Sequence, residues 1–395
     1  MKKLTIIAAF VAALISLDAS AQRKGEAPKE DKKPAYTFTD TKLIEQSPVK
    51  NQGSSGTCWS YSGIGFIESE LIRKGKGVHD LSDMWIVRHT YFEKAVKYAR
   101  MHGTINLSAG GATHDVFNMI DKYGIVPEEV YEGLNYGTDI NRHGELDAAI
   151  KGYMDAIIRN PNGTLSTGWE AGLNGILDAY LGALPTDFVY NGKQYTPSSF
   201  ASELGIKGSD YVSVTSFTHH PYGSEFAVEV PDNWAWGVSV NLPLADFMAL
   251  IDRCLNSGVA VLWASDVSEK GFKYNDGFAV LPETNLEKLD DSEKAKWSAL
   301  TPAEIARTIS DLQEPVTEID VTPELRQLWF DNYTSTDDHG MVLCGVAEAQ
   351  NGQTFYRVKN SWSDTNIYKG YFYVSQPFVM GKTMNIMVPL DMLSK

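Results

Sequence analysis

The first third of the globular chain shows helical patterns of apolar residues. After a Gly- and Ser-rich turn at 52–57, apolar side chains recur at spacings of three and four: Ile64, Ile67, Leu71 and Ile72. This spacing is typical of one helix face, and Gly75 ends the pattern, so a helix is predicted from about Cys58 to Lys74. Similar patterns predict helices at about 82–101 and 113–122.

The last third favours strands. Residues 258–264 form a continuous apolar run, and short segments rich in β-formers follow at 341–347, 355–358 and 371–374. A polar helical segment at 285–312 interrupts them. Helices first and strands later predict an α+β fold with two lobes and a cleft between them. We assign a helical lobe to 36–129, an insertion to 130–240 and a β-rich lobe to 241–395.

The N-terminus has the composition of an export signal. Two Lys residues follow Met1, an apolar run extends from Leu4 to Leu17, and Ala19-Ser20-Ala21 supplies a small-x-small cleavage site. The apolar run is shorter than the roughly 20 residues that span a bilayer. We therefore expect residues 1–21 to be a signal peptide, 22–35 to be a flexible leader, and the mature protein to be periplasmic or secreted.

Composition and charge narrow the possible partners. The chain has 395 residues, of which 43% are hydrophobic and 22% charged, a balance typical of a soluble globular protein. Its formal net charge of -15 disfavours binding to nucleic acid and to anionic membranes. We expect neither as a partner.

Three cysteines are too few and too irregular for a disulfide framework. Cys254 and Cys344 lie in apolar surroundings and are predicted to be buried thiols. Cys58 instead begins the first predicted helix, where unpaired N–H groups and the helix dipole favour a thiolate. The glycines of the preceding turn allow backbone N–H groups to approach an oxyanion, and Gln52 adds a side-chain N–H donor.

A thiol nucleophile needs a base, and the chain offers eight histidines. His339 opens a predicted strand, and Asn360 ends the next one, so a hairpin would bring the Asn amide to the imidazole. Trp362 would then cover that contact. Taken alone, His339 is equally an ordinary surface residue and Asn360 an ordinary turn residue. Surface or capping roles are the default for five others: His79, His89, His102, His114 and His143.

The adjacent pair His219–His220 raises the question of a metal. No third ligand stands at a plausible spacing from the pair in the sequence, so no metal site is predicted. No organic cofactor is indicated either.

Together, the patches around Cys58, His339 and Asn360 resemble papain-like cysteine peptidases, in which Gln, Cys, His and Asn occur in this order. The chain is most similar to the bleomycin hydrolase and aminopeptidase C branch, over roughly Ile44 to the C-terminus. The branch resemblance rests on five segments: 51–59, where Ser55 replaces a disulfide Cys of papain, 216–221, 229–233, 265–268, and 359–362 followed by 369–371.

The resemblance implies roles for these residues. Cys58 is the nucleophile, His339 the base and acid, Asn360 its orienter and Gln52 an oxyanion-hole donor. Gly110 and Gly111 match the pair whose backbone holds extended substrate, although Ala112-Thr113 replaces a frequent Gln-Trp. Trp362 borders the substrate site. A C-terminal arm lies in the cleft in this branch, and the Lys395 carboxylate would pair with a substrate amino group.

The predicted function is therefore that of a cysteine aminopeptidase acting on peptides through a thioester. A papain-like endopeptidase, a binding protein that has lost turnover, and acyl transfer to another amine are the alternatives. Members of the branch are commonly cytosolic hexamers, so the resemblance leaves a homo-oligomer open, whereas the signal peptide points to export.

Overall fold

The structure is a computed structural model that describes residues 34–289, 294 and 297–393. Residues Pro34–Lys395 form one compact unit. The predicted signal peptide and most of the predicted leader lie outside the described residues. Within the described ranges, no helix is both long enough and apolar enough to cross a membrane.

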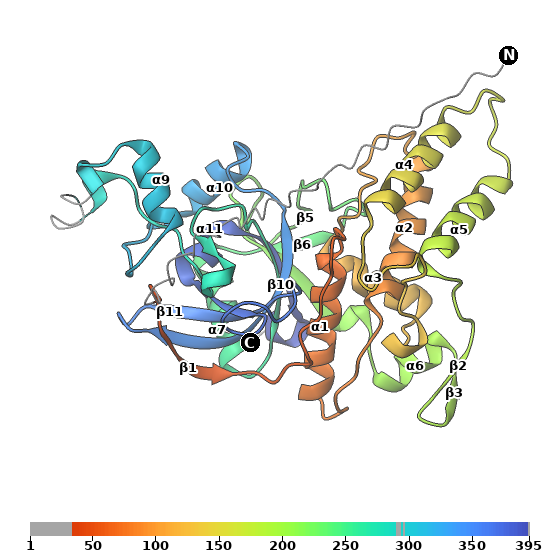
Figure 1. The fold of residues 1–395 in the computed structure, drawn as a ribbon, viewed down its shortest axis with the longest axis horizontal. Helices are drawn as coiled ribbons and strands as arrows, with labels where there is room; N and C mark the ends of the chain where they lie inside the picture. Colours follow the sequence, from red (N-terminus) through yellow and green to blue (C-terminus); the bar gives the residue numbers. More distant parts are fainter. Residues whose placement is uncertain (1–33, 290–293, 295–296, 394–395) are drawn as a thin grey trace, which may run out of the picture. The chain divides into compact units, whose positions relative to one another are not determined.

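The helices of the N-terminal half lie together beside the sheet, with α1 nearest to it (Figure 1). The helices are α1 (Cys58–Arg73), α2 (Asp83–Arg100), α3 (Thr113–Tyr123), α4 (Gly144–Ile158), α5 (Gly168–Leu181), α6 (Pro197–Leu204), α7 (Leu244–Asn256), α9 (Pro302–Ser310), α10 (Pro323–Asp331), α11 (Gln376–Lys382) and α12 (Leu390–Leu393). The three helices predicted first in the chain are confirmed within a residue or two. Local signals fix their ends: the Ser82 hydroxyl accepts the Trp85 N–H at 3.0 Å, and Gly124 ends α3 with φ 73°.

Eleven strands of the described chain form one mixed sheet. The order is β5-β6-β4-β13-β7-β10-β11-β12-β9-β8, and β1 pairs with β10 outside this path. The strands are β1 (Phe38–Leu43), β4 (Tyr211–Thr215), β5 (Glu225–Ala227), β6 (Val238–Asn241), β7 (Val261–Ser265), β8 (Phe272–Lys273), β9 (Phe278–Ala279), β10 (His339–Ala349), β11 (Thr354–Lys359), β12 (Tyr371–Ser375) and β13 (Thr383–Pro389), while β2 (Phe188–Tyr190) and β3 (Lys193–Tyr195) form a separate hairpin.

The segment assigned to an insertion contributes to this sheet. Strands β4, β5 and β6 come from 211–241, and β4 pairs antiparallel with β13 near the C-terminus. The β-rich part therefore includes strands from about thirty residues before 241, the boundary taken from the sequence. The short lengths of these strands, and a pairing partner far away in sequence, explain why local patterns did not reveal them.

The core lies where α1 meets the sheet. Residues of α1 such as Ile64, Phe66 and Ile67 are fully buried in one cluster with Trp263 of β7 and Met341 of β10. A helix buried on nearly all sides is rigid, so both ends of α1 are well fixed. The buried thiols predicted at 254 and 344 are confirmed, since both side chains are free and fully buried.

The C-terminal tail packs against other elements as far as Leu393, and the predicted placement of its last residue in the cleft stays a prediction. Helix α12 packs on α7 and β13, Met392 is buried, and Arg253 donates to the Met392 carbonyl at 2.7 Å. Through Leu393 the tail lies in this packing and not in the catalytic cavity described below. Apolar burial against α7 accounts for this position. Lys395 lies outside the described residues.

Candidate active site

The site begins at the first residue of α1. Cys58 opens the helix, and the preceding Thr57 makes no side-chain cap, so the first-turn N–H groups remain near the thiol. The next residue, Trp59, is buried, and its indole N–H donates to the Ala109 carbonyl at 3.0 Å. This bond and the packing of the core fix the direction in which the thiol points.

Strand β10 approaches this turn closely because Gly340 has no side chain. A Cβ at this position would lie 2.6 Å from the Ser62 hydroxyl oxygen, 3.2 Å from the Trp59 Cα and 3.4 Å from the Cys58 carbonyl oxygen. Only glycine permits this contact without a shift of the backbone. The preceding residue, His339, is thereby brought to the mouth of α1.

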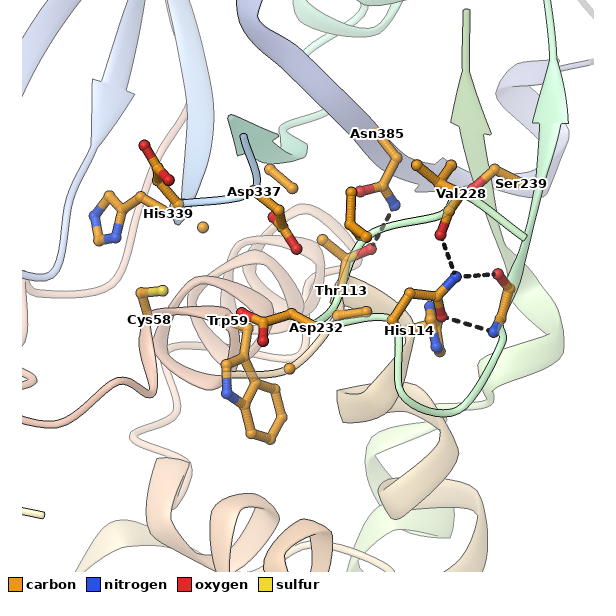
Figure 2. Close-up of a pocket in the computed structure, with 18 residues that line it drawn as sticks. Cys58, Trp59, Thr113, His114, Val228, Asp232, Ser239, Asp337, His339 and Asn385 are labelled. Carbon is orange, nitrogen blue, oxygen red and sulfur yellow. Dashed lines mark hydrogen bonds between the residues drawn. The ribbon is translucent and has the colours of Figure 1, made fainter. Parts of the chain in front are cut away.

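Cys58 and His339 line the same cavity, at one end of it (Figure 2). The cavity has a volume of about 500 Å³, including space open to solvent. Within the described chain, no hydrogen bond joins the thiol to the ring. The two groups therefore share one cavity and are separate in this structure, as is common for catalytic pairs without substrate.

The imidazole is held by an amide. Nε2 of His339 lies 2.7 Å from Oδ1 of Asn360, and the same oxygen accepts the Ser361 backbone N–H at 2.8 Å. The backbone donor identifies this atom as the amide oxygen, so Nε2 must carry a hydrogen. Nδ1 is then the basic nitrogen of the neutral ring. Trp362 packs on the imidazole with ring centroids 4.5 Å apart, so the contact is covered as predicted.

Burial dominates the electrostatics of the pair. Burial raises the pKa of the Cys58 thiol to about 12, although the backbone N–H groups of Gly340 and Trp59 act in the opposite direction. Burial also lowers the pKa of His339 to about 4. Burial therefore opposes the thiolate that the helix N-terminus was expected to favour, and in the substrate-free structure it favours the neutral form of both groups. A neutral His339 has a lone pair available for the thiol proton.

Gln52 is buried beside the site and does not line the cavity. Its Nε2 donates to the Ser55 carbonyl at 2.9 Å, and its Oε1 accepts the Ser361 hydroxyl at 2.7 Å. These bonds fix the amide and use one of its two N–H hydrogens. The second N–H group of the amide is the one that would donate a hydrogen bond to an oxyanion. The oxyanion-hole role of Gln52 stays a prediction.

A buried lysine fixes the backbone at the glycine pair. The Lys94 ammonium is fully buried and donates to the carbonyls of Ser108, at 2.9 Å, and Gly110. Gly111 lines the cavity against the Trp59 ring. The Asp232 carboxylate lies directly on Gly110, because a Cβ there would be 2.0 Å from Oδ2. Asp232 therefore stands where a substrate along the glycine pair would end.

Three carboxylates line the cavity: Asp232, Asp337 and Asp338. Burial, together with the charges of the other two, raises the pKa of Asp337 to about 8, and burial also raises the pKa of Asp232. Sequence analysis missed these residues. The only local signal was the Asp-Asp pair directly before His339.

Another correction concerns His114, which lines the cavity, whereas a surface or capping role was expected.

The remaining predicted site residues lie elsewhere. Trp362 packs against Phe272 and Tyr274 and borders a hollow other than the catalytic cavity. Its contact with substrate stays a prediction. The His219–His220 pair does have a third group, which the sequence concealed: Glu229 faces both rings, at 3.0 and 3.4 Å.

Comparisons with known proteins agree with this geometry. The papain family cysteine protease model matches residues 37–159, and the peptidase C1-like family model matches 320–395. Aminopeptidase C of Lactobacillus delbrueckii subsp. lactis is 26% identical, over 84% of this chain and 77% of the relative. Aminopeptidase C of Streptococcus thermophilus is also 26% identical, over 89% and 82%. The crystal structure of PepW from Lactobacillus rhamnosis shares the fold, with a TM-score of 0.69 and 21% identity over 91% of this chain and 83% of PepW.

Proposed function

Because the chain belongs to the papain-like cysteine peptidases, in their aminopeptidase C branch, we propose that it removes residues from the N-terminus of peptides through a thioester on Cys58. One observation carries the proposal. Cys58 and His339 line a single cavity, and Asn360 fixes the His339 ring in the tautomer that leaves Nδ1 free.

The reaction follows from these positions. As the Cys58 sulfur attacks the peptide carbonyl, Nδ1 of His339 takes the thiol proton, so the two neutral groups need not ionise beforehand. His339 then returns the proton to the amine as the C–N bond breaks, which leaves a thioester. Water, deprotonated by the same imidazole, hydrolyses the thioester. N–H donors such as that of Gln52 would stabilise the oxyanion, each contributing about 3 kcal/mol.

Selection of a free N-terminus requires an anion at the end of the substrate site. The Asp232 carboxylate covers Gly110, and Asn106 donates to its Oδ1 at 2.8 Å. A peptide lying along the glycine pair would bring its terminal ammonium to this carboxylate, and extension beyond it would clash. The Lys395 carboxylate, implied by the family resemblance, is the second candidate for the same role.

The test compares a peptide carrying a free N-terminus with its acetylated copy. We expect wild type to cleave only the free peptide and Cys58→Ala to cleave neither. Asp232→Asn should raise KM for the free peptide, whereas the matched surface variant Asp246→Asn should not. Deleting residues 394–395 removes the Lys395 carboxylate and keeps that of Asp232, so it distinguishes which of the two binds the substrate ammonium. Equal cleavage of both peptides by wild type would instead favour the endopeptidase alternative.

We also propose that the protein is exported and cleaved after Ala21. The basic start, the apolar run and the small-x-small site support this proposal. Intact-mass measurement of the mature protein after expression with its own N-terminus tests it. A mass that includes residues 1–21 would contradict it. Nucleic acid is not proposed as a partner, because the net charge is -15.

A further inference from the structure

Three side chains with metal-binding chemistry converge away from the catalytic pair. His219, His220 and Glu229 each offer one ligand atom, and these atoms all lie within 4.8 Å of one another. Nε2 of His219 is 3.0 Å from one carboxylate oxygen of Glu229, and Nε2 of His220 is 3.4 Å from the other. Two imidazoles thus face one carboxylate.

The hydrogen-bond pattern indicates that a cation belongs between them. Oε1 of Gln327 accepts the Thr218 backbone N–H at 2.7 Å, which identifies it as the amide oxygen. The same oxygen lies 3.1 Å from Nδ1 of His219, so Nδ1 carries a hydrogen. In the neutral ring the Nε2 lone pair then points at Glu229, and two lone pairs at 3.0 Å repel each other. A proton on Nε2 or a metal ion would remove that repulsion.

We propose that His219, His220 and Glu229 bind one divalent transition-metal ion of the Zn²⁺ class. Imidazole nitrogens with one carboxylate are a common ligand set for Zn²⁺. Ligand atoms at 2.0–2.1 Å from a tetrahedral ion are roughly 3.3 Å apart, and the two observed N–O separations of 3.0 and 3.4 Å are close to that value. Since all three ligand atoms lie within 4.8 Å of one another, side-chain adjustments of about an ångström or two would bring them around one ion.

The surroundings hold these ligands in place. The Gln327 amide oxygen accepts the Nδ1 hydrogen of His219 and so orients the ring with Nε2 toward Glu229, and the Gln327 Nε2 donates to Asp331 at 2.8 Å. The His220 ring stacks on Phe226 with centroids 4.1 Å apart. Because the Glu229 side chain is 58% exposed, water can occupy the fourth coordination position.

The proposed metal site adjoins, through Glu229, a segment that lines the catalytic cavity. Glu229 stands between Val228 and Val230, and both valines line the catalytic cavity with Asp232 (Figure 2). Asn233 ties this segment together by donating to the carbonyls of Val228, at 3.0 Å, and Gly237, at 2.9 Å. An ion on Glu229 would anchor the segment to the loop that carries the two histidines. The metal is thus a structural clamp on the wall of the substrate site.

Zn²⁺ binding to the full chain tests the site. Cys58→Ala is used throughout, because the catalytic thiol and imidazole are themselves potential ligands. After chelator treatment and removal of the chelator, calorimetric titration with ZnCl₂ should show one site. In that background, Glu229→Gln and, separately, His220→Asn should weaken binding at least about tenfold. His102→Asn is the matched control, since His102 is exposed with φ 53°, which Asn tolerates, and it should bind as before.

Hydrogen exchange provides a second readout on the same proteins. Zn²⁺ should slow amide exchange across 224–233 in Cys58→Ala and leave it unchanged in the Glu229→Gln variant. Circular dichroism without metal verifies that each variant is folded, and either ligand variant suffices if the other does not fold. Absence of binding, or equal binding in a folded ligand variant, would overturn the proposal and leave the peptidase proposal untouched, since all these proteins lack the nucleophile.

Discussion

At the residue scale, each nitrogen of one imidazole has a distinct task. Nε2 of His339 is bound to Asn360 at 2.7 Å, which leaves Nδ1 as the base in the cavity that holds Cys58. Burial raises the pKa of the thiol and lowers the pKa of the ring, so it favours the neutral form of both groups. The chemistry therefore depends on proton transfer during attack, and the helix N-terminus helps to stabilise the anion as it forms.

Replacement of the base should remove most of the turnover. We expect His339→Ala to lower kcat/KM for a peptide with a free N-terminus by about 10²–10⁴-fold, the usual contribution of general acid–base catalysis. Steady-state kinetics with the exposed His102→Asn variant as control measure the effect. Unchanged kcat/KM in His339→Ala would contradict the assignment of the base.

Titration of the same ring has a defined direction. Burial lowers the pKa of His339 to about 4, so the ring should stay unprotonated as pH falls through 6.5 and gain its proton only near pH 4. NMR of the ring carbon Cε1 measures the midpoint of the His339 titration, with the signal assigned by its loss in His339→Ala. No substrate is present, so ionisation of a substrate does not affect the result. A midpoint near 6.5 would show that the ring is not desolvated as described.

The resemblance to papain-like peptidases, rather than local spacing, singled out Cys58, His339 and Asn360. The structure places the first two in one cavity and bonds the third to the imidazole. The sequence was insufficient for Asp232 and Glu229. Their roles arise from contacts with residues distant in sequence, namely Gly110 for the first and the histidine pair for the second. No local spacing encodes such contacts. The burial that raises the pKa of the thiol was also not visible in the sequence, since burial depends on the completed fold.

At the element scale, the contact between α1 and β10 positions the catalytic pair. Gly340 allows this contact, because an added Cβ would meet Ser62 and the backbone of Trp59 and Cys58 within 3.4 Å. The strand cannot come as close to the helix with any larger residue. The relative position of Cys58 and His339 thus depends on a glycine at position 340.

Gly340→Ala should therefore reduce both stability and activity. We expect the free energy of unfolding to fall by about 1–3 kcal/mol, as for overpacked cores, and kcat/KM to fall because β10 must shift away from α1. Gly175→Ala is the matched control. A Cβ at that helical position meets nothing within 4 Å, so stability should stay equal or rise by roughly 0.5–1 kcal/mol. Wild-type stability and activity in Gly340→Ala, measured by denaturant unfolding and kinetics, would contradict the account.

Elements with strong local patterns were predicted well. Helices α1, α2 and α3 and strands β10, β11 and β12 agree with their sequence patterns within a few residues. Strands β4 and β13 were missed, because each pairs with a partner more than 160 residues away, as in the pair Val214–Ile386. Such pairings are decided by the sheet as a whole, not by the local alternation of residues.

At the scale of the whole molecule, the position of the C-terminal tail bears on which group could select a free N-terminus. The described tail packs on α7 and not over the glycine pair, whereas Asp232 does lie over it. The segment between the two predicted lobes thus provides the wall of the substrate site. The same segment carries the histidine pair and Glu229, so it adjoins both the carboxylate of Asp232 and the proposed metal site.

A substitution in the tail distinguishes its contribution to stability from a contribution to the choice between free and acetylated peptides. Met392 is buried in the main core, so Met392→Ala should lower the free energy of unfolding by about 2–5 kcal/mol. The ratio of cleavage of free to acetylated peptide should not change, because Met392 does not line the cavity. Denaturant unfolding and the two-peptide assay measure both effects. Cleavage of acetylated peptide by a folded Met392→Ala variant would show that the tail takes part in selection.

The central claim is that the Cys58 sulfur becomes acylated with His339 as its base. Acid-quenched intact-mass analysis of the enzyme mixed with a peptide ester carrying a free N-terminus, followed by mapping of the modified residue, tests it most directly. The account predicts one acyl group on Cys58 in wild type, much slower acylation in His339→Ala and none in Cys58→Ala. Acylation of another residue, or hydrolysis of the ester by Cys58→Ala at the wild-type rate, would contradict it.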